Sequence, residues 1–331
     1  MSELRLNLVT KEWVIISIEK ARKPENFRQM RNKKILPEYL ESCPFCHGNE
    51  HMTPDEIIRI PDDSSWLVRV IPNKFAVLSP EGQKIRKNEG LKYQLAGVGR
   101  HEVIIESPLH NMPTALLPLS DIAGIIRTYK DRFIAVYNNP LIEHVIIFKN
   151  QGECSGTSIV HPHSQLIGTP ITPFQVRERI FDARRYFDNT GECLICASLR
   201  DELADGRRII LNTEHFVTFI PYAALSPFHT WIFPKRHSAS FGDIHDEEII
   251  DLAYNLKTIL SKFYYGLENP DFNYVIRSES IKECDSEYFH WYLSIVLRIS
   301  QASGLELGSG MYTNPSIPEE VAGFLRKVKI S

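Results

Sequence analysis

The sequence predicts an α+β fold of two tandem units, residues 1–172 and residues 173–331, each a mostly antiparallel sheet with packed helices. Three observations predict this fold: an internal repeat, short β-branched segments in each half, and one long amphipathic segment in each half. At 331 residues the chain is also long for one ordinary domain, which favours two units.

The internal repeat places cysteine pairs, strand-like segments and histidines in the same order in both halves. CPFC at 43–46 precedes WLVRVIPNKFAVL, HEVIIESPLH and HPH, and CLIC at 193–196 precedes HFVTFIPYAAL, HTWIFPKRH and HWY. The cysteine pairs lie 150 residues apart, whereas the histidines that match lie 127 and 129 apart. Because the order is kept while loop lengths vary, the sequence indicates duplication of a unit well over one hundred residues long.

Short segments rich in β-branched residues, bounded by Pro, Gly or Asn, predict the strands. In the first half they are LVRVIP (67–72), EVIIES (102–107), EHVIIFKN (143–150) and SQLIGTPI (164–171). In the second half they are FVTFIPY (216–222), TWIFP (230–234), NYVIRS (273–278) and YLSIVLRI (292–299).

Apolar residues at helical spacing predict one amphipathic helix in each unit, at 119–139 and at 246–267. Ser120 and Asp121, near the start of the first helix, are its candidate N-cap residues. A further helix over 173–191 is expected to join the two units.

The composition excludes several classes of function. The 38 basic and 41 acidic residues give a net charge of −3, which provides no general attraction for nucleic acid or membranes. The chain has no apolar run of transmembrane length, and its start, MSELRLN, lacks the apolar segment of a secretory signal. We therefore expect a cytoplasmic protein in which a local cluster of residues binds any anionic ligand.

The two C-x-x-C pairs belong to candidate metal sites. The first set is Cys43, Cys46, His110 and His161, and the repeated set is Cys193, Cys196, His237 and His290. Zinc takes thiolate and imidazole ligands tetrahedrally, and a site with four protein ligands is closed and structural. We expect one or two zinc ions per chain, with redox-active dithiols as the alternative for the C-x-x-C pairs.

The stretch NQGECSGTSIVHPHSQLIG, residues 150–168, carries the other candidate site. Side chains two residues apart on a strand lie on one face, so His161, His163 and Gln165 can face one locality. The preceding SGTS provides hydroxyl and backbone N–H groups that suit phosphate oxygens. Taken alone, the stretch is also compatible with a polar surface loop that carries two solvated histidines.

The motif SGTSIVHPHSQ resembles the active-site motif of the galactose-1-phosphate uridylyltransferase family, within the histidine-triad superfamily. The likeness covers nearly the whole chain, because LVTKEWVIISIEKARKP, CPFC, RVIPNKF, ESPLH, FKNQG and ASGLELGSG occur in that family's order. It implies two tandem histidine-triad-like units, a homodimer, and as substrates a nucleotide sugar with a sugar 1-phosphate or phosphate.

The resemblance also implies roles for individual residues. His163 matches the nucleophile that receives a nucleotidyl group, and Gln165 and Ser158 match residues that hydrogen-bond the transferred phosphoryl group. Asn73 and Asn150 match nucleotide contacts. A neutral imidazole can attack an α-phosphorus and displace a sugar phosphate, and we expect a backbone carbonyl to fix its tautomer through the other ring nitrogen.

Three positions bear on the second unit and on the substrate. Tyr292 stands where the repeat would place a second nucleophile, so one active centre per chain is expected. Ser164 replaces the family's most usual Gly, and MYTNPSIPEEVAGFLR lacks the glutamine-bearing stretch of typical uridylyltransferases. Both departures resemble the ADP-glucose phosphorylase branch, whereas Glu306 still matches the family's sugar-contacting glutamate.

Three functions stay open on the sequence. The first is a uridylyltransferase of galactose metabolism that moves UMP between UDP-glucose and a hexose 1-phosphate. The second is an ADP-sugar phosphorylase, in which phosphate is the acceptor. The third is a catalytically idle, zinc-containing nucleotide-binding protein, and the intact pair of His163 and Gln165 argues against it.

Overall fold

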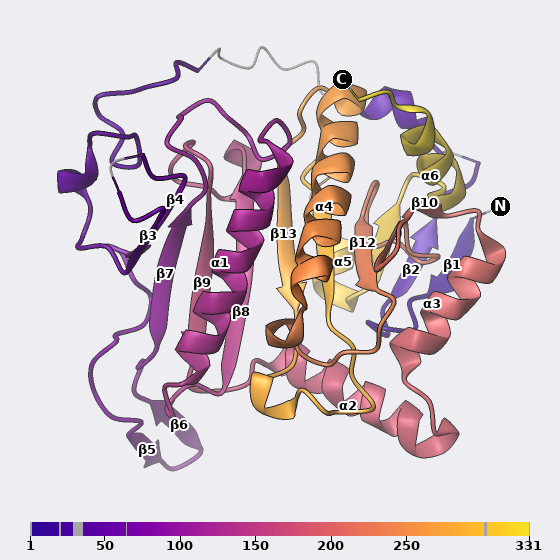
Figure 1. Cartoon of the computed structure of the whole chain (residues 1–331). Helices are drawn as coiled ribbons and strands as arrows, with labels where there is room; N and C mark the ends of the chain where they lie inside the picture. Colours follow the sequence, from indigo (N-terminus) through magenta and orange to yellow (C-terminus); the bar gives the residue numbers. More distant parts are fainter. Residues whose placement is uncertain (1, 20, 29–35, 64, 301–302, 331) are drawn as a thin grey trace.

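The computed structural model describes residues 2–19, 21–28, 36–63, 65–300 and 303–330, and a ten-stranded sheet forms its centre (Figure 1). The strands in spatial order are β10 (Ile209–Asn212), β11 (Phe216–Phe219), β12 (Thr230–Pro234), β14 (Tyr292–Leu297), β13 (Phe272–Arg277), β8 (His144–Gln151), β9 (His163–Thr169), β7 (Arg100–Ile105), β4 (Val68–Pro72) and β3 (Ile58–Ile60). Neighbouring strands in this sheet pair antiparallel. The predicted α+β class is confirmed.

β8 and β13 pair at the middle of the sheet, and the strand order is mirrored on either side of them. From β8 outward the order is β9, β7, β4 and β3, and from β13 outward it is β14, β12, β11 and β10. This order fits the internal repeat, but the two expected sheets are continuous. The pairing of β8 with β13 satisfies backbone groups that each half alone would leave at an exposed sheet edge.

α1 (Leu119–Tyr137) and α4 (Asp246–Leu267) lie side by side over one face of the sheet, one in each half (Figure 1). Their apolar faces pack on inward side chains of the strands, such as Leu166 and Leu293, in the largest core cluster. Both predicted helices are confirmed. The predicted N-cap of α1 is wrong: Pro118 holds that position, and Ser120 and Asp121 lie in the first turn, where the Asp121 carboxylate favours the helix dipole.

The opposite face of the sheet carries the side chains of His163 and Tyr292, and we call it the site face. In the second half, α3 (Leu194–Asp205) and Val9 cover this face and pack on an aromatic cluster that includes Trp231. In the first half, the loop that carries CPFC covers the end of the site face beside β4 and β7, where Phe45 packs in a smaller cluster. Each half therefore has apolar material on both faces of its sheet.

The remaining elements lie around this sheet. α2 (Phe174–Thr190) joins the halves as predicted, and the expected boundary after residue 172 falls in the connection between β9 and α2. The others are β1 (Glu3–Leu6), β2 (Trp13–Ile16) and β15 (Tyr312–Asn314) in a small sheet, the hairpin β5 (Arg86–Glu89) and β6 (Lys92–Leu95), α5 (Gly304–Ser309), α6 (Pro318–Lys327), and the 3-10 turns η1 (Pro24–Phe27), η2 (Glu50–Met52), η3 (Glu153–Ser155), η4 (Phe241–Asp243) and η5 (Ile281–Glu283).

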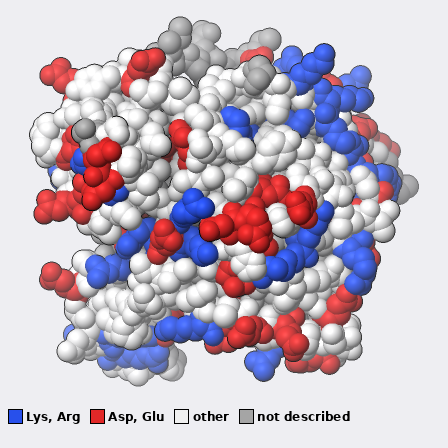
Figure 2. Space-filling model, in the orientation of Figure 1, with Lys and Arg blue, Asp and Glu red and all other residues white. Residues whose placement is uncertain are grey.

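The surface carries both signs of charge. Figure 2 shows acidic and basic side chains interspersed over the face that carries α1 and α4, in keeping with the net charge of −3. Among the described helices, none has the length and apolar character needed to cross a membrane.

Candidate active site and metal centres

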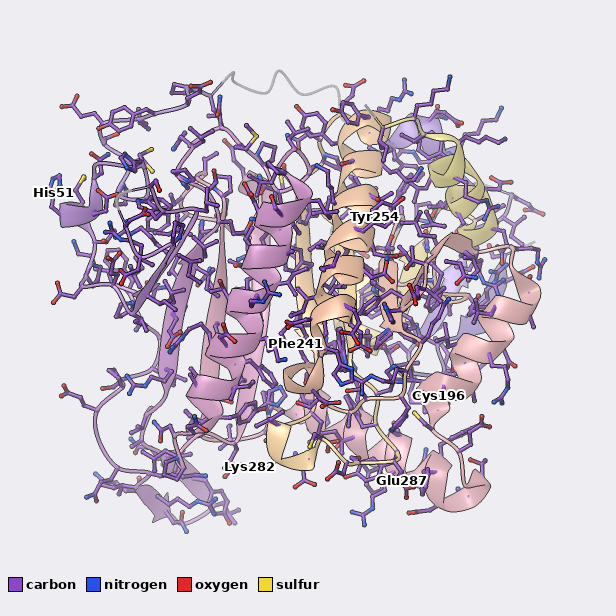
Figure 3. All side chains as sticks on the ribbon, in the orientation of Figure 1. His51, Cys196, Phe241, Tyr254, Lys282 and Glu287 are labelled. Atoms are coloured by element: carbon purple, nitrogen blue, oxygen red, sulfur yellow. The ribbon has the colours of Figure 1, made fainter. Side chains whose placement is uncertain are left out.

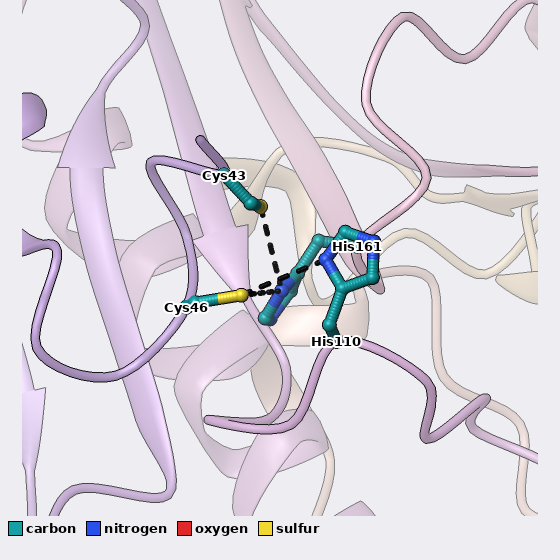
Figure 4. Close-up of side chains that lie close together, drawn as sticks. All are labelled: Cys43, Cys46, His110 and His161. Carbon is teal, nitrogen blue, oxygen red and sulfur yellow. Dashed lines mark hydrogen bonds between the residues drawn. The ribbon is translucent and has the colours of Figure 1, made fainter. Parts of the chain in front are cut away.

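The first Cys2His2 set comes together as one buried cluster (Figure 4). Nδ1 of His161 lies 3.8 Å from Sγ of Cys43 and 3.7 Å from Sγ of Cys46. Nδ1 of His110 lies 3.6 Å from Sγ of Cys46. A tetrahedral site with bonds of about 2.0 Å to nitrogen and 2.3 Å to sulfur places such atoms about 3.6 Å apart, so these donors fit one metal ion.

The surroundings of this cluster orient its donors toward a common centre. Nε2 of His161 donates to the carbonyl oxygen of Ser107 at 2.7 Å, which leaves the Nδ1 lone pair facing the thiols. The backbone N–H of Leu40 points at Sγ of Cys46, 3.4 Å away. Burial raises the pKa of the Cys43 thiol to about 11, and a bound cation is what favours the ionised form of such a thiol.

The second set also forms a cluster, at the start of α3. Sγ of Cys196, labelled in Figure 3, lies 3.3 Å from Nδ1 of His237 and 3.3 Å from Nδ1 of His290. His237 donates through Nε2 to the carbonyl oxygen of Ser286 at 3.0 Å, an arrangement that again turns Nδ1 toward the thiols. This cluster is more open than the first, because His237 is exposed whereas Cys193 and His290 are buried. All six cysteines belong to the described residues, and none of them forms a disulfide bond.

His163 is the first residue of β9, directly after Pro162 and the cluster member His161. Nδ1 of His163 donates to the carbonyl oxygen of His161 at 2.8 Å, which confirms the expected backbone acceptor. The ring is 6% exposed and lies edge-on to Phe45 at 5.3 Å between ring centres. Burial lowers the pKa of His163, so its imidazole is neutral, with the proton on Nδ1 and the lone pair on Nε2.

Gln165 follows His163 on the site face and contacts His101, for which the sequence alone predicts no role in the site. The backbone N–H of Val77 donates to Nδ1 of His101 at 3.2 Å, so Nε2 of His101 carries the proton. This Nε2–H donates to Oε1 of Gln165 at 2.8 Å. The Asn73 amide nitrogen lies 3.5 Å from the same oxygen, so the structure brings Asn73 and Gln165 together through His101.

A signal in the sequence could have identified His101. His229 lies 128 residues after His101, and this spacing is close to the 127 and 129 residues that separate the matched histidines of the two candidate metal sites. In the structure, Nε2 of His229 lies 2.9 Å from Oγ of Ser294, the residue that occupies in β14 the position of Gln165 in β9. The polar pair of β7 with β9 is therefore repeated in β12 with β14.

The other predicted nucleotide and phosphate contacts lie at the end of β8 and on the loop between β8 and β9. Asn150, on β8, accepts a hydrogen bond at Oδ1 from the amide of Asn273 on β13 at 2.7 Å. Its own amide N–H2 group is directed away from that contact. Ser158 is exposed on the loop that leads to His161.

Glu306 is not among the described side chains that contact His163 or Gln165. Its carboxylate accepts hydrogen bonds from the backbone N–H of Ser303 at 2.8 Å and of Thr313 at 3.2 Å, together with both hydroxyl groups. The hydrogen bond from the Ser303 hydroxyl group contributes most, and together these bonds lower the pKa of Glu306 to about 2. Glu306 thus forms the capping box of α5 and connects this helix to β15.

Ser164 lies on the helix side of β9, because it alternates with His163 and Gln165. It is 1% exposed, and its Oγ accepts a hydrogen bond from the hydroxyl group of Tyr129 at 2.7 Å. The Tyr129 oxygen also lies 2.6 Å from that of Tyr274 and 2.9 Å from a carboxylate oxygen of Glu106. Ser164 therefore belongs to a buried polar network, and its hydroxyl group is directed away from the site face.

A buried ion pair completes this network directly behind the candidate nucleophile. Nζ of Lys149 lies 2.6 Å from Oε2 of Glu106, and both side chains are 0% exposed. The same ammonium group lies 3.4 Å from the carbonyl oxygen of His163. Burial alone would raise the pKa of Glu106, but the charge and hydrogen bond of Lys149 act together with the hydroxyl groups of Thr114 and Tyr129 and hold this pKa below its usual value. The sequence alone does not indicate a role for either residue.

In the second half, a buried aromatic ring lies at the position that corresponds to His163. Tyr292 begins β14 as His163 begins β9, but its ring packs 5.4 Å from that of Trp231 and 5.0 Å from that of Phe233. Tyr292 is 2% exposed, and α3 covers this aromatic cluster. Large side chains therefore occupy the space in which a second active centre would have to bind a nucleotide.

The chain is similar to known proteins over nearly its whole length. Residues 1–173 match the galactose-1-phosphate uridyl transferase N-terminal domain, and residues 179–298 match the C-terminal domain. An ADP-glucose phosphorylase of Arabidopsis thaliana is 36% identical over 99% of this chain and 93% of its own length. A galactose-1-phosphate uridylyltransferase of Thermotoga maritima is 26% identical over 100% of this chain and 99% of its own length.

A solved structure gives the same result in three dimensions. The crystal structure of an ADP-glucose phosphorylase from Arabidopsis thaliana with bound ADP-glucose covers 100% of both chains, with a TM-score of 0.85 and 35% identity. This similarity extends over both halves of the continuous sheet.

We expect Glu106→Gln to lower the free energy of unfolding by about 3–5 kcal/mol, because it leaves the Lys149 ammonium buried without a counter-charge. The double variant Glu106→Gln/Lys149→Met should recover part of this loss, since it removes the buried charge. Denaturant unfolding followed by far-UV circular dichroism measures both variants. A single variant as stable as the wild type would contradict this role of the ion pair.

Proposed function

This chain belongs to the galactose-1-phosphate uridylyltransferase family, and we propose that it transfers nucleotidyl groups through a covalent intermediate on His163. The uridylyltransferases and the ADP-glucose phosphorylase among its relatives are nucleotidyl-transferring enzymes. The observation that carries the proposal is the hydrogen bond of 2.8 Å from Nδ1 of His163 to the carbonyl oxygen of His161. It leaves Nε2 as the unprotonated nitrogen of a neutral ring, which is the nucleophile that this chemistry requires.

Two half-reactions follow from this nucleophile. In the first, Nε2 attacks the phosphorus bonded to the nucleoside, and the bond from that phosphorus to the bridging oxygen breaks. The hexose 1-phosphate leaves with the bonding electrons. In the second, an oxygen of the acceptor attacks the same phosphorus, and His163 leaves as a neutral imidazole. Between the two steps the ring is cationic, and the carbonyl oxygen of His161 stabilises it by accepting from Nδ1–H.

The phosphoryl and nucleotide contacts are part of the proposal. Oε1 of Gln165 accepts from His101, so the amide N–H2 group of Gln165 can donate to an oxygen of the transferred phosphoryl group. Ser158 provides a second, hydroxyl donor from its exposed loop. We assign Asn73 and Asn150 to the nucleotide, and the bond that Asn150 accepts from Asn273 supports this by leaving the Asn150 amide N–H2 group for a ligand.

ADP-glucose with phosphate as acceptor is the substrate pair we favour. The identity to the Arabidopsis ADP-glucose phosphorylase is 36% over nearly the whole chain, against 26% for the Thermotoga uridylyltransferase. UDP-glucose with a hexose 1-phosphate is the second candidate, and the domain matches to the uridyl transferase family support it. The first half-reaction is the same in both cases except for the base.

The remaining assignments concern the rest of the chain. We propose zinc as the resident metal of both Cys2His2 clusters, where it would hold the ligating segments together without taking part in the reaction. Glu306 is proposed to contact the sugar, which requires its carboxylate to exchange a hydrogen bond with Thr313 for one with a hydroxyl group. Division into units after residue 172, a homodimer and a cytoplasmic location stay predictions.

The covalent intermediate can be tested by intact-protein mass spectrometry after separate incubation with ADP-glucose and UDP-glucose. We expect the wild type to gain one nucleotidyl group, AMP in the favoured case and UMP in the second. His163→Asn should show no gain and should lose turnover by at least about 10⁴-fold, because an amide cannot form the intermediate. Exchange of labelled glucose 1-phosphate into the nucleotide sugar by this variant would refute the role of His163.

A second test concerns the number of active centres. Tyr292→Phe should keep the full nucleotidylation of one group per chain, because the buried phenol is replaced by a ring of similar shape that can still pack on Trp231. Peptide mapping of the labelled protein locates the group. A stoichiometry above one per chain, or label on the peptide that contains Tyr292, would show that the second half has its own centre.

The metal assignment predicts two zinc ions per chain after purification in metal-free buffers, measured by inductively coupled plasma mass spectrometry. Cys43→Ser should lose one of them and lower Tm by roughly 5–10 °C, because a structural metal contributes directly to folding free energy. Cys284→Ser, a change outside both clusters, should keep both ions. One zinc ion per wild-type chain would contradict the assignment for one cluster, and a zinc-free wild type would contradict it for both.

A further inference from the structure

The loop between β8 and β9, residues 152–162, belongs to the first half but is held by side chains of the second half. Oδ2 of Asp271 accepts a hydrogen bond from the backbone N–H of Cys154 at 2.9 Å. The amide of Asn273 donates to the carbonyl oxygen of Ser155 at 2.9 Å. Asp271 directly precedes β13 and Asn273 lies on it, so both contacts cross the middle of the sheet.

The backbone of this loop fits closely around the Asp271 side chain. Gly152 has a φ of +87°, a conformation that side chains disfavour. A Cβ atom at Gly152 would lie 2.0 Å from Oδ1 of Asp271, so any other residue would force the loop away. The loop therefore needs a glycine at position 152, because the Asp271 carboxylate of the other half occupies the space of a side chain there.

Asn273 links this loop to the candidate nucleotide contact. It lies opposite Asn150 in the register of β8 with β13, and its amide donates to Oδ1 of Asn150 at 2.7 Å as well as to Ser155. Nε of Arg298, from the end of β14, donates to the carbonyl oxygen of Cys154 at 3.3 Å. Three second-half side chains thus contact the segment that leads to Ser158 and His161.

We propose that Asp271 and Asn273 are positioning residues through which the second half shapes the β8–β9 loop for the phosphoryl group. The proposal rests on the proposed function and deepens it. Neither residue has to touch the reacting atoms: Asp271 orients the backbone at Cys154, and Asn273 orients Ser155 and the Asn150 amide. A half with a buried tyrosine in place of a nucleophile would then still contribute to the active centre.

Substitutions that remove the hydrogen-bonding groups of Asp271 and Asn273 can distinguish a positioning role from a general effect on stability. Asp271→Leu removes the acceptor for the Cys154 N–H, whereas Asp271→Asn keeps an acceptor oxygen of the same reach and should restore most of the function. Asn273→Leu removes both donated bonds at similar side-chain volume. Asn255→Ala is the matched control, because it removes a buried amide of the second half whose hydrogen-bond partners among the described residues, Thr213, Thr218 and Asp251, belong to that half.

Two measurements decide the proposal. The first is hydrogen–deuterium exchange of a peptide spanning residues 152–160, which needs no substrate. We expect faster exchange of this peptide in Asp271→Leu and Asn273→Leu, and wild-type exchange in Asp271→Asn and Asn255→Ala. The second is the single-turnover rate of nucleotidylation, which should fall about 10–100-fold in the two leucine variants, while in Asp271→Leu nucleotide affinity changes less than about threefold.

The outcomes separate this proposal from the one on which it rests. A wild-type protein that is never nucleotidylated refutes the proposed function, and loop exchange alone then decides whether the second half holds the loop. Unchanged loop exchange in both leucine variants would overturn the proposal. Faster exchange with a wild-type nucleotidylation rate would also overturn it, because the contacts would then be structural only.

Discussion

The hydrogen bond from His163 to the carbonyl oxygen of His161 is the interaction on which the proposed active centre depends. It acts over two residues of one strand, so it requires the HPH segment to stay extended with both imidazoles on one side. Two neighbours keep the segment in place: the Cys2His2 cluster holds His161 through Nδ1, and Ser107 holds it through Nε2. A metal ion in this cluster would therefore act on the reaction through backbone geometry.

The continuous sheet brings residues of the second half into contact with the strands of the first half that carry the proposed site. Pairing of β8 with β13 brings the second half against the strand that carries Lys149 and Asn150. On the helix side, Tyr274 of β13 joins the buried network that reaches Ser164. On the site face of the second half, Tyr292 packs within an aromatic cluster, whereas the first half has His163 at the corresponding position. The proposed centre in the first half would thus have support from both halves.

Much of the fold and part of the site could be predicted from the sequence, for reasons that lie in local patterns. Periodicity gave the bounds of α4, and the repeat paired distant histidines with the correct cysteines. Alternation along β9 already implies that Ser164 faces away from His163, so the position of Ser164 in the core could have been predicted from the sequence. The partnership of Glu106 with Lys149, and of Asn273 with Asn150, depends on which strands are neighbours in space. No short-range pattern encodes that order, because a duplicated chain could equally well have formed two separate sheets.

The central claim is that His163 presents a neutral ring with its proton on Nδ1. Long-range ¹H–¹⁵N correlation spectra of protein with ¹⁵N-labelled histidine measure this directly, with His163 assigned by its absence from the His163→Asn spectrum. The account predicts a protonated Nδ1 and a bare Nε2 at neutral pH. A proton on Nε2 instead would mean that the nitrogen facing a substrate cannot attack phosphorus, and it would contradict the account.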